Sequence, residues 1–109
     1  MSISEYLENN PEPPVESYIE YFSTNDYHFK PVPEEIILFS IFLDSVMNDK
    51  PYQDVQAIYY LAKFLQNLCP GSSNYNKLVP EKQLALKDFL TSDNSFISYV
   101  VNNKVNCNV

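Results

Sequence analysis

The feature that most limits the fold is the near absence of glycine, because Gly71 is the only one in 109 residues. Tight β-hairpin turns need residues with positive φ, and glycine supplies most of them. Apolar residues make up 45% of the chain, which is enough for a folded core rather than a disordered polymer. The composition therefore disfavours an all-β fold, and the length suits one domain.

Prolines mark the starts of several apolar segments. Pro33, Pro51 and Pro80 each precede such a run, and proline suits the first turn of a helix, where its missing N–H has no partner to lose. Glu34 and Glu35 would also favour the positive end of a helix. Ser92 or Asp93 could cap a last short helix. The four helices expected from these signals are 33–48, 51–69, 80–91 and 94–102.

The first third of the chain carries glutamates three or four residues apart, but PEPP at 11–14 interrupts them. Proline prevents one continuous rod, so we expect two short helices, 2–9 and 14–23. The whole sequence, residues 1–109, then reads as one all-α domain, a compact bundle of about five or six short helices. Within it, 1–31 is an acidic segment packed as short helices, 72–78 a loop and 103–109 a flexible tail.

Side-chain periodicity predicts which faces are buried. The 33–48 segment is apolar on almost every side, so it should be the most buried helix. In 51–69 a polar series recurs at helical spacing and includes a tyrosine: Gln53, Gln56, Tyr60, Lys63 and Asn67. That series predicts an exposed Tyr60 and a buried Tyr59.

Charge excludes two classes of partner. The net charge is −7 and all seven basic residues are lysine. Without arginine, the preferred fork for phosphate and guanine, nucleic-acid binding is not expected, and an anionic membrane surface is disfavoured by the same charge. The most apolar run, 36–43, is too short to cross a bilayer. Residues 1–35 hold eight acidic residues and a single lysine, so the imbalance belongs to this third.

Residues that could do chemistry are few. Cys69 and Cys107 are expected to be reduced thiols of a cytoplasmic protein without a signal peptide, with a disulfide as the alternative. His28 and Asp26 could offer two metal ligands, but no His/Cys cluster has zinc-site spacing. No phosphate loop or nucleophile motif is present. We therefore expect no enzyme, no cofactor and no metal.

One region resembles a known family. The pattern lies in VPEEIILFSIFLDSVMNDKPYQDVQAIYYLAKFL and in LVPEKQLALKDFL, within residues 32–90. It is similar to a family of small uncharacterised bacterial all-helical proteins, a domain of unknown function. Val79 stands where that family's pattern has a capping threonine, and Lys82 intrudes before Gln83. The resemblance implies an all-α fold and no mechanism.

The remaining hypotheses concern binding. The first is a non-enzymatic protein-binding module, such as an inhibitor or immunity-type protein, that binds a basic protein partner through an acidic, tyrosine-rich N-terminal surface. The residues expected to form that surface are Tyr6, Glu8, Glu12, Glu16, Tyr18, Glu20, Tyr21, Tyr27 and Tyr60. The alternative is a structural protein that self-associates as a homo-oligomer. A small hydrolase-like or metal-dependent enzyme is the third choice, and a solvated acidic coat is the competing explanation of the charge.

Overall fold

The computed structural model describes residues 3–48 and 55–107, and every regular element in these two ranges is helical. The α-helices are α1 (Ile3–Asn9), α2 (Val15–Tyr21), α3 (Glu34–Asn48), α4 (Val55–Asn67), α5 (Ser73–Lys77), α6 (Pro80–Leu90) and α7 (Ser95–Lys104). One turn of 3-10 helix, Tyr27–Phe29, lies between α2 and α3. The predicted all-α class is confirmed. The start expected for the second long helix, 51–54, lies outside the described residues.

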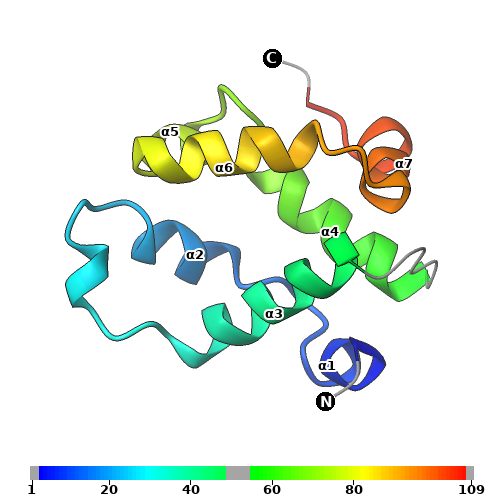
Figure 1. Cartoon of the computed structure of the whole chain (residues 1–109), viewed down its shortest axis with the longest axis horizontal. Coiled ribbons are helices and arrows are strands. Elements are labelled where there is room, and N and C mark those ends of the chain that lie inside the picture. The colour runs from blue at the N-terminus through cyan, green and yellow to red at the C-terminus, as the bar shows by residue number, and fades with distance from the viewer. Residues whose placement is uncertain (1–2, 49–54, 108–109) are drawn as a thin grey trace.

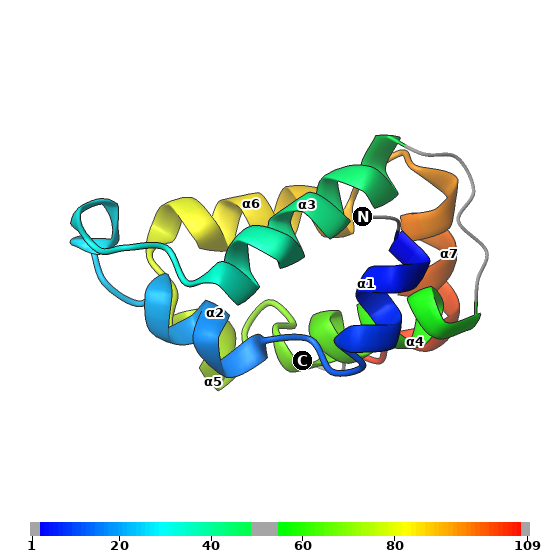
Figure 2. The same cartoon turned by 90° about the horizontal axis from the view of Figure 1, so that it is seen from below.

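The other helices pack against one face of α4 and leave its opposite face to solvent. Figure 1 shows α4 running diagonally through the molecule, with α1 and α3 on one side and α6 and α7 on the other. Figure 2 shows α1, α7 and the start of α4 grouped at one end, with α2 and α5 at the other. The radius of gyration is 13.4 Å, close to the value of about 13 Å expected for a compact chain of this length.

Local capping explains several boundaries. Pro80 opens α6, as expected. Asn94, rather than Ser92 or Asp93, caps α7, because its side chain accepts from the backbone N–H groups of Phe96 and Ile97.

The predicted loop at 72–78 is wrong, because Ser73–Lys77 is helical. The Ser72 hydroxyl caps this turn by accepting from the backbone N–H of Tyr75, 3.1 Å away. Tyr75 is buried, and its hydroxyl donates to the Gln83 carbonyl. Gly71, with φ 88°, supplies the reversal before this turn. The burial of Tyr75 and the cap from Ser72 therefore stabilise a helical turn in a segment whose composition is typical of a loop.

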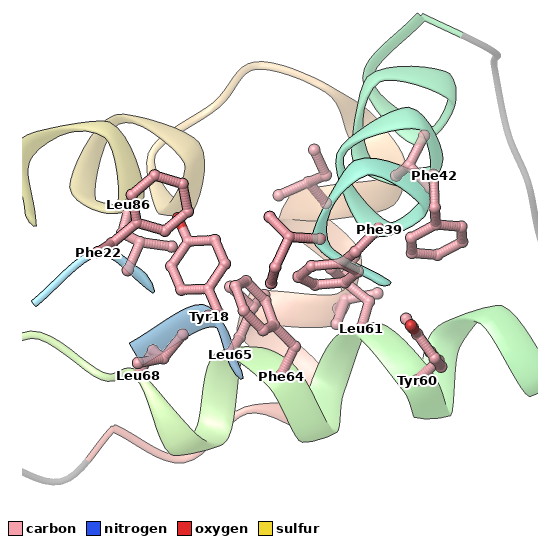
Figure 3. Close-up of a cluster of buried hydrophobic side chains, with 14 of the residues drawn as sticks. Tyr18, Phe22, Phe39, Phe42, Tyr60, Leu61, Phe64, Leu65, Leu68 and Leu86 are labelled. Atoms are coloured by element: carbon pink, nitrogen blue, oxygen red, sulfur yellow. The ribbon is translucent and has the colours of Figure 1, made fainter. Parts of the chain in front are cut away.

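Aromatic rings form the centre of the core (Figure 3). The Phe39 ring lies 4.5 Å from that of Phe64, and the Phe42 ring lies 5.0 Å from that of Tyr60, measured between centroids. Both pairs meet edge to face, the geometry that aromatic quadrupoles favour. Tyr18 of α2 also packs edge-on against Phe64, at 5.3 Å. Three helices thus join through rings, and α4 supplies the shared surface.

The phase predicted for α4 is wrong. Tyr60 is 2% exposed and Tyr59 is 66% exposed, the reverse of the expectation. The buried stripe contains Ala57, Tyr60, Leu61, Phe64, Leu65 and Leu68, an i, i+3, i+4, i+7 series. Tyr60 is tolerated inside because its hydroxyl is hydrogen-bonded to that of Tyr6, 3.1 Å away. Gln53 lies outside the described residues.

The expectation that α3 is the most buried helix is also wrong. It buries Ile36, Phe39, Phe42 and Val46 and leaves three apolar side chains, Ile37, Ile41 and Met47, exposed. Five of the thirteen residues of α4 are buried, against four of the fifteen of α3. Eight of the fifteen residues of α3 are exposed against five of the thirteen of α4, so α4 is the more buried helix.

The end of the chain is tethered to α4, contrary to the predicted flexible tail. Cys69 and Cys107 form a disulfide across 38 residues, with Cα atoms 5.4 Å apart. The expectation of two reduced thiols is therefore wrong in this structure. Gln66 adds two hydrogen bonds to the backbone of Asn106, at 2.8 and 2.7 Å. The tail follows α7, which packs along α4 and so delivers Cys107 to the end of α4. Residues 108 and 109 lie outside the described residues.

Candidate functional site

The five tyrosines predicted to face a partner are part of the core instead. Tyr6, Tyr18, Tyr21, Tyr27 and Tyr60 are each no more than 9% exposed. Four of the hydroxyls have partners within the chain: Tyr27 donates to the Glu81 carboxylate at 2.8 Å, Tyr21 donates to the Lys30 carbonyl at 3.5 Å, and Tyr6 bonds to Tyr60. Although these tyrosines have acidic neighbours in the sequence, their rings lie on the buried, apolar faces of the helices. This part of the predicted surface is corrected.

The four glutamates of the predicted surface, Glu8, Glu12, Glu16 and Glu20, are exposed. Glu12 pairs with Lys63 of α4, with oxygen and nitrogen 2.8 Å apart. This pair is solvent-exposed and so adds little stability. The structure thus keeps an acidic surface on α1 and α2 but removes the tyrosines from it.

Two of these glutamates share a hollow with a third that the sequence did not single out. Glu12, Glu16 and Glu35 line a hollow of about 420 Å³ between the PEPP turn and α3. Tyr6 and Tyr60 also line it, and Ser17 donates a hydrogen bond to the Glu35 carboxylate. Glu8 and Glu20 lie elsewhere on the surface. The predicted partner surface did not include Glu35, and no sequence pattern links it to Glu16.

The hydroxyls in this hollow are neutral at physiological pH. Burial, and then the hydrogen bond to Tyr6, raise the pKa of Tyr60 far above its ordinary value. Burial also raises the pKa of Tyr6, with a further contribution from the nearby Glu35 charge. Neither phenol is poised as a base or nucleophile. The charge of the hollow therefore comes from its carboxylates, and it suits a cationic group better than an anionic one.

His28 is exposed, and its ring lies 4.0 Å from that of Tyr27. Across residues 3–48 and 55–107, no group of three or more histidine, cysteine, aspartate or glutamate side chains could hold a metal ion. That no metal or cofactor is needed stays a prediction.

The buried phenols make stability sensitive to alkaline pH. Burial raises the pKa of Tyr18 from 10.0 to about 12, so the folded state holds this proton after the unfolded chain has released it. The stabilisation is complete below pH 10 and is lost as the pH rises to about 12, a change of about 2 to 3 kcal/mol. Urea unfolding across this range measures it. Tyr18→Phe should flatten the decline, and an unchanged slope would contradict the assignment.

A second hollow lies on the outer face of the bundle, between α4 and α7. It encloses about 490 Å³ and is lined by Val55, Ile58, Tyr59, Ala62, Lys63, Gln66, Tyr99 and Lys104. Val55, Tyr59 and Tyr99 are 73%, 66% and 49% exposed, and they line the same hollow, so their apolar surface is gathered in one place, as at interaction sites. Tyr59, which the side-chain periodicity predicts to be buried, is therefore part of this exposed hollow.

No helix in the described part of the chain is long and apolar enough to cross a membrane. The comparisons with known proteins do not identify a family: no family model, no curated protein and no solved structure matches the chain. The resemblance of residues 32–90 to a family of bacterial helical proteins therefore stays a prediction.

Proposed function

We propose that this protein is a non-enzymatic binding module that recognises a basic protein surface, in the manner of an inhibitor or immunity-type protein. The observation that carries the proposal is the concentration of exposed carboxylates on α1, α2 and the start of α3. Those described as exposed within the first 35 residues are Glu5, Glu8, Glu12, Glu16, Glu20, Asp26, Glu34 and Glu35. Lys30 is the only basic residue in the same third.

Such a surface acts mainly on the rate of encounter. Exposed carboxylates concentrated in one third of the chain attract a positive partner and orient it before contact. The hollow between Glu16 and Glu35 is a concave site in which a lysine or arginine side chain of the partner would pair with these carboxylates. Because the five tyrosines are buried, the short-range contact area must come from other side chains, such as the partly buried Pro13, Pro14 and Val15 beside the hollow.

A charge-reversal pair tests this function. We expect Glu16→Lys with Glu20→Lys to lower the association rate with a captured basic partner by roughly tenfold at low salt, because attraction becomes repulsion. The matched control is Asp88→Lys with Asp93→Lys, which makes the same change in net charge on exposed positions of α6 and the α6–α7 turn. Surface plasmon resonance at low and high salt measures the rates.

Equal effects of the two pairs would show that only net charge matters, and no effect of either would leave the acidic third as a coat for solubility. Either result contradicts the proposed surface. Circular dichroism of each variant checks that the fold is retained.

Self-association is the second candidate function, favoured by the exposed Ile37 and Ile41 on the outer face of α3, at 47% and 56%. Large apolar side chains on one exposed helical face are typical of an interface. Light scattering distinguishes the two functions, because apolar assembly persists in high salt and charge-driven binding does not.

The proposed cytoplasmic location loses its argument from the cysteines. A disulfide between Cys69 and Cys107 is more typical of oxidising compartments. Fractionation of the source cells, with thiol trapping during lysis, tests location and bond together.

A further inference from the structure

The outer face of α4 carries an apolar stripe that no described element covers. Val55, Ile58, Tyr59 and Ala62 recur at i, i+3, i+4 and i+7, and Tyr99 of α7 extends the stripe sideways. From Val55 to Gln66 the stripe is roughly 16 Å long. It therefore matches about three turns of a helix laid along it.

The groove has a fixed wall. Gln66 is held by its two hydrogen bonds to Asn106. The disulfide between Cys107 and Cys69 fixes the same C-terminal segment beside the end of α4. Tyr59 is the larger of the two exposed apolar side chains of α4, Val55 and Tyr59, and the Lys63 ammonium lies 5.8 Å from its ring centroid. A large, rigid aromatic beside an apolar trough is typical of a binding anchor.

The charge of the groove is opposite to that of the molecule. Among the described residues that line it, the two charged ones, Lys63 and Lys104, are both basic, although the chain has 14 acidic residues and seven lysines. The Lys63 ammonium is already paired with the Glu12 carboxylate, 2.8 Å away, in an exposed pair, so an acidic occupant would share this ammonium with Glu12 or displace it. The groove therefore complements an occupant that is apolar on one side and acidic at the edges.

We propose that this α4/α7 groove binds an acidic amphipathic helix of a partner protein. The apolar face of that helix would cover Val55, Ile58 and Tyr59, and its flanking aspartates or glutamates would meet Lys63 and Lys104. This is the mode in which a helix lies in a groove with anchors at i, i+3 or i+4 and i+7. It adjoins the acidic surface at the Lys63–Glu12 ion pair, so the protein would present two neighbouring faces of opposite charge.

A second copy of this chain fits the groove less well. In a symmetric dimer the same surface meets itself, so Lys63 and Lys104 would face the lysines of the other copy. Like charges at an interface oppose association.

Two synthetic helical peptides test the proposal. Each has about 14 residues, with leucines at i, i+4, i+7 and i+11; one has glutamates flanking the leucines and the other has lysines. We expect the glutamate peptide to bind the intact, oxidised protein roughly tenfold more tightly in fluorescence anisotropy, because both rim lysines attract it. Equal affinities, tighter binding of the lysine peptide, or no binding of the glutamate peptide would overturn the proposal.

Matched variants locate the site. Lys63→Gln with Lys104→Glu should remove the preference for the glutamate peptide, whereas Lys77→Gln with Lys87→Glu, the same charge change on exposed positions of α5 and α6, should keep it. Tyr59→Ser should lower the affinity for the glutamate peptide by roughly tenfold. Leu84→Ser, which changes a side chain of α6 that is 60% exposed, should leave that affinity unchanged. A glutamate peptide unaffected by the groove variants binds elsewhere, and a protein dimer that Tyr59→Ser dissociates would assign the groove to a second copy. Both outcomes overturn the proposal.

Discussion

Phe42→Ala should lower the free energy of unfolding by about 3 to 5 kcal/mol, the range for removing a buried aromatic ring. Phe42 is 2% exposed, and its ring lies 5.0 Å from that of Tyr60 and 5.9 Å from that of Tyr6. Alanine would leave a cavity where α1, α3 and α4 meet. Urea unfolding followed by far-UV circular dichroism measures the loss.

The neighbouring residue provides the control for this prediction. Ile41→Ala changes a side chain that is 56% exposed on the same helix, and it should alter stability by less than about 0.5 kcal/mol. Phe42→Leu retains most of the volume and should cost about 1 kcal/mol, so it remains measurable if Phe42→Ala is too unstable to fold. A cost below about 1 kcal/mol for Phe42→Ala would mean that the ring cluster contributes little to the core.

The helix boundaries could be predicted because their causes are local. Pro33 and Pro80 act through their own φ angles and missing N–H groups, and α3 and α6 begin within one residue of them. The Ser72 cap is local as well, but it follows a stretch rich in serine and asparagine. What makes 73–77 helical is the burial of Tyr75 against α6, which no local pattern encodes.

The phase of α4 could not be read from polarity alone, because this helix is apolar on two sides. One side contains Leu61, Phe64 and Leu65, and the other contains Val55, Ile58 and Tyr59. Tyrosine and alanine fit either side. The side that becomes core is decided by α1 and α7, which pack on it from opposite ends of the sequence.

The tyrosines of the acidic third did carry a usable signal. Tyr18, Tyr21 and Phe22 are spaced i, i+3 and i+4, the pattern of one helical face. Glu16 and Glu20 occupy the other face and are exposed. Acidic neighbours in sequence therefore say nothing about exposure of the residues between them, because a helix separates adjacent residues by about 100°.

The disulfide had no local signal, since its cysteines are 38 residues apart. We expect removal of this cross-link to lower the free energy of unfolding by about 4 kcal/mol, because the unfolded chain regains the entropy of a loop of that length. Cys107→Ser is the cleanest test. Cys107 is exposed, so its substitution removes the bond without opening a cavity. Thermal and urea unfolding measure the effect.

Two comparisons separate the cross-link from packing. Wild-type protein treated with a reductant should unfold like Cys107→Ser, and the reductant should leave Cys107→Ser unchanged. Cys69→Ser should be less stable than Cys107→Ser, because Cys69 is 4% exposed and serine would place a hydroxyl in an apolar site. The oxidised wild-type protein should show no free thiol when denatured, since Cys69 and Cys107 are its only cysteines. Two free thiols in protein purified without reductant, with equal stability of wild type and Cys107→Ser, would mean that α7 and the tail are held by Gln66 and helix packing alone.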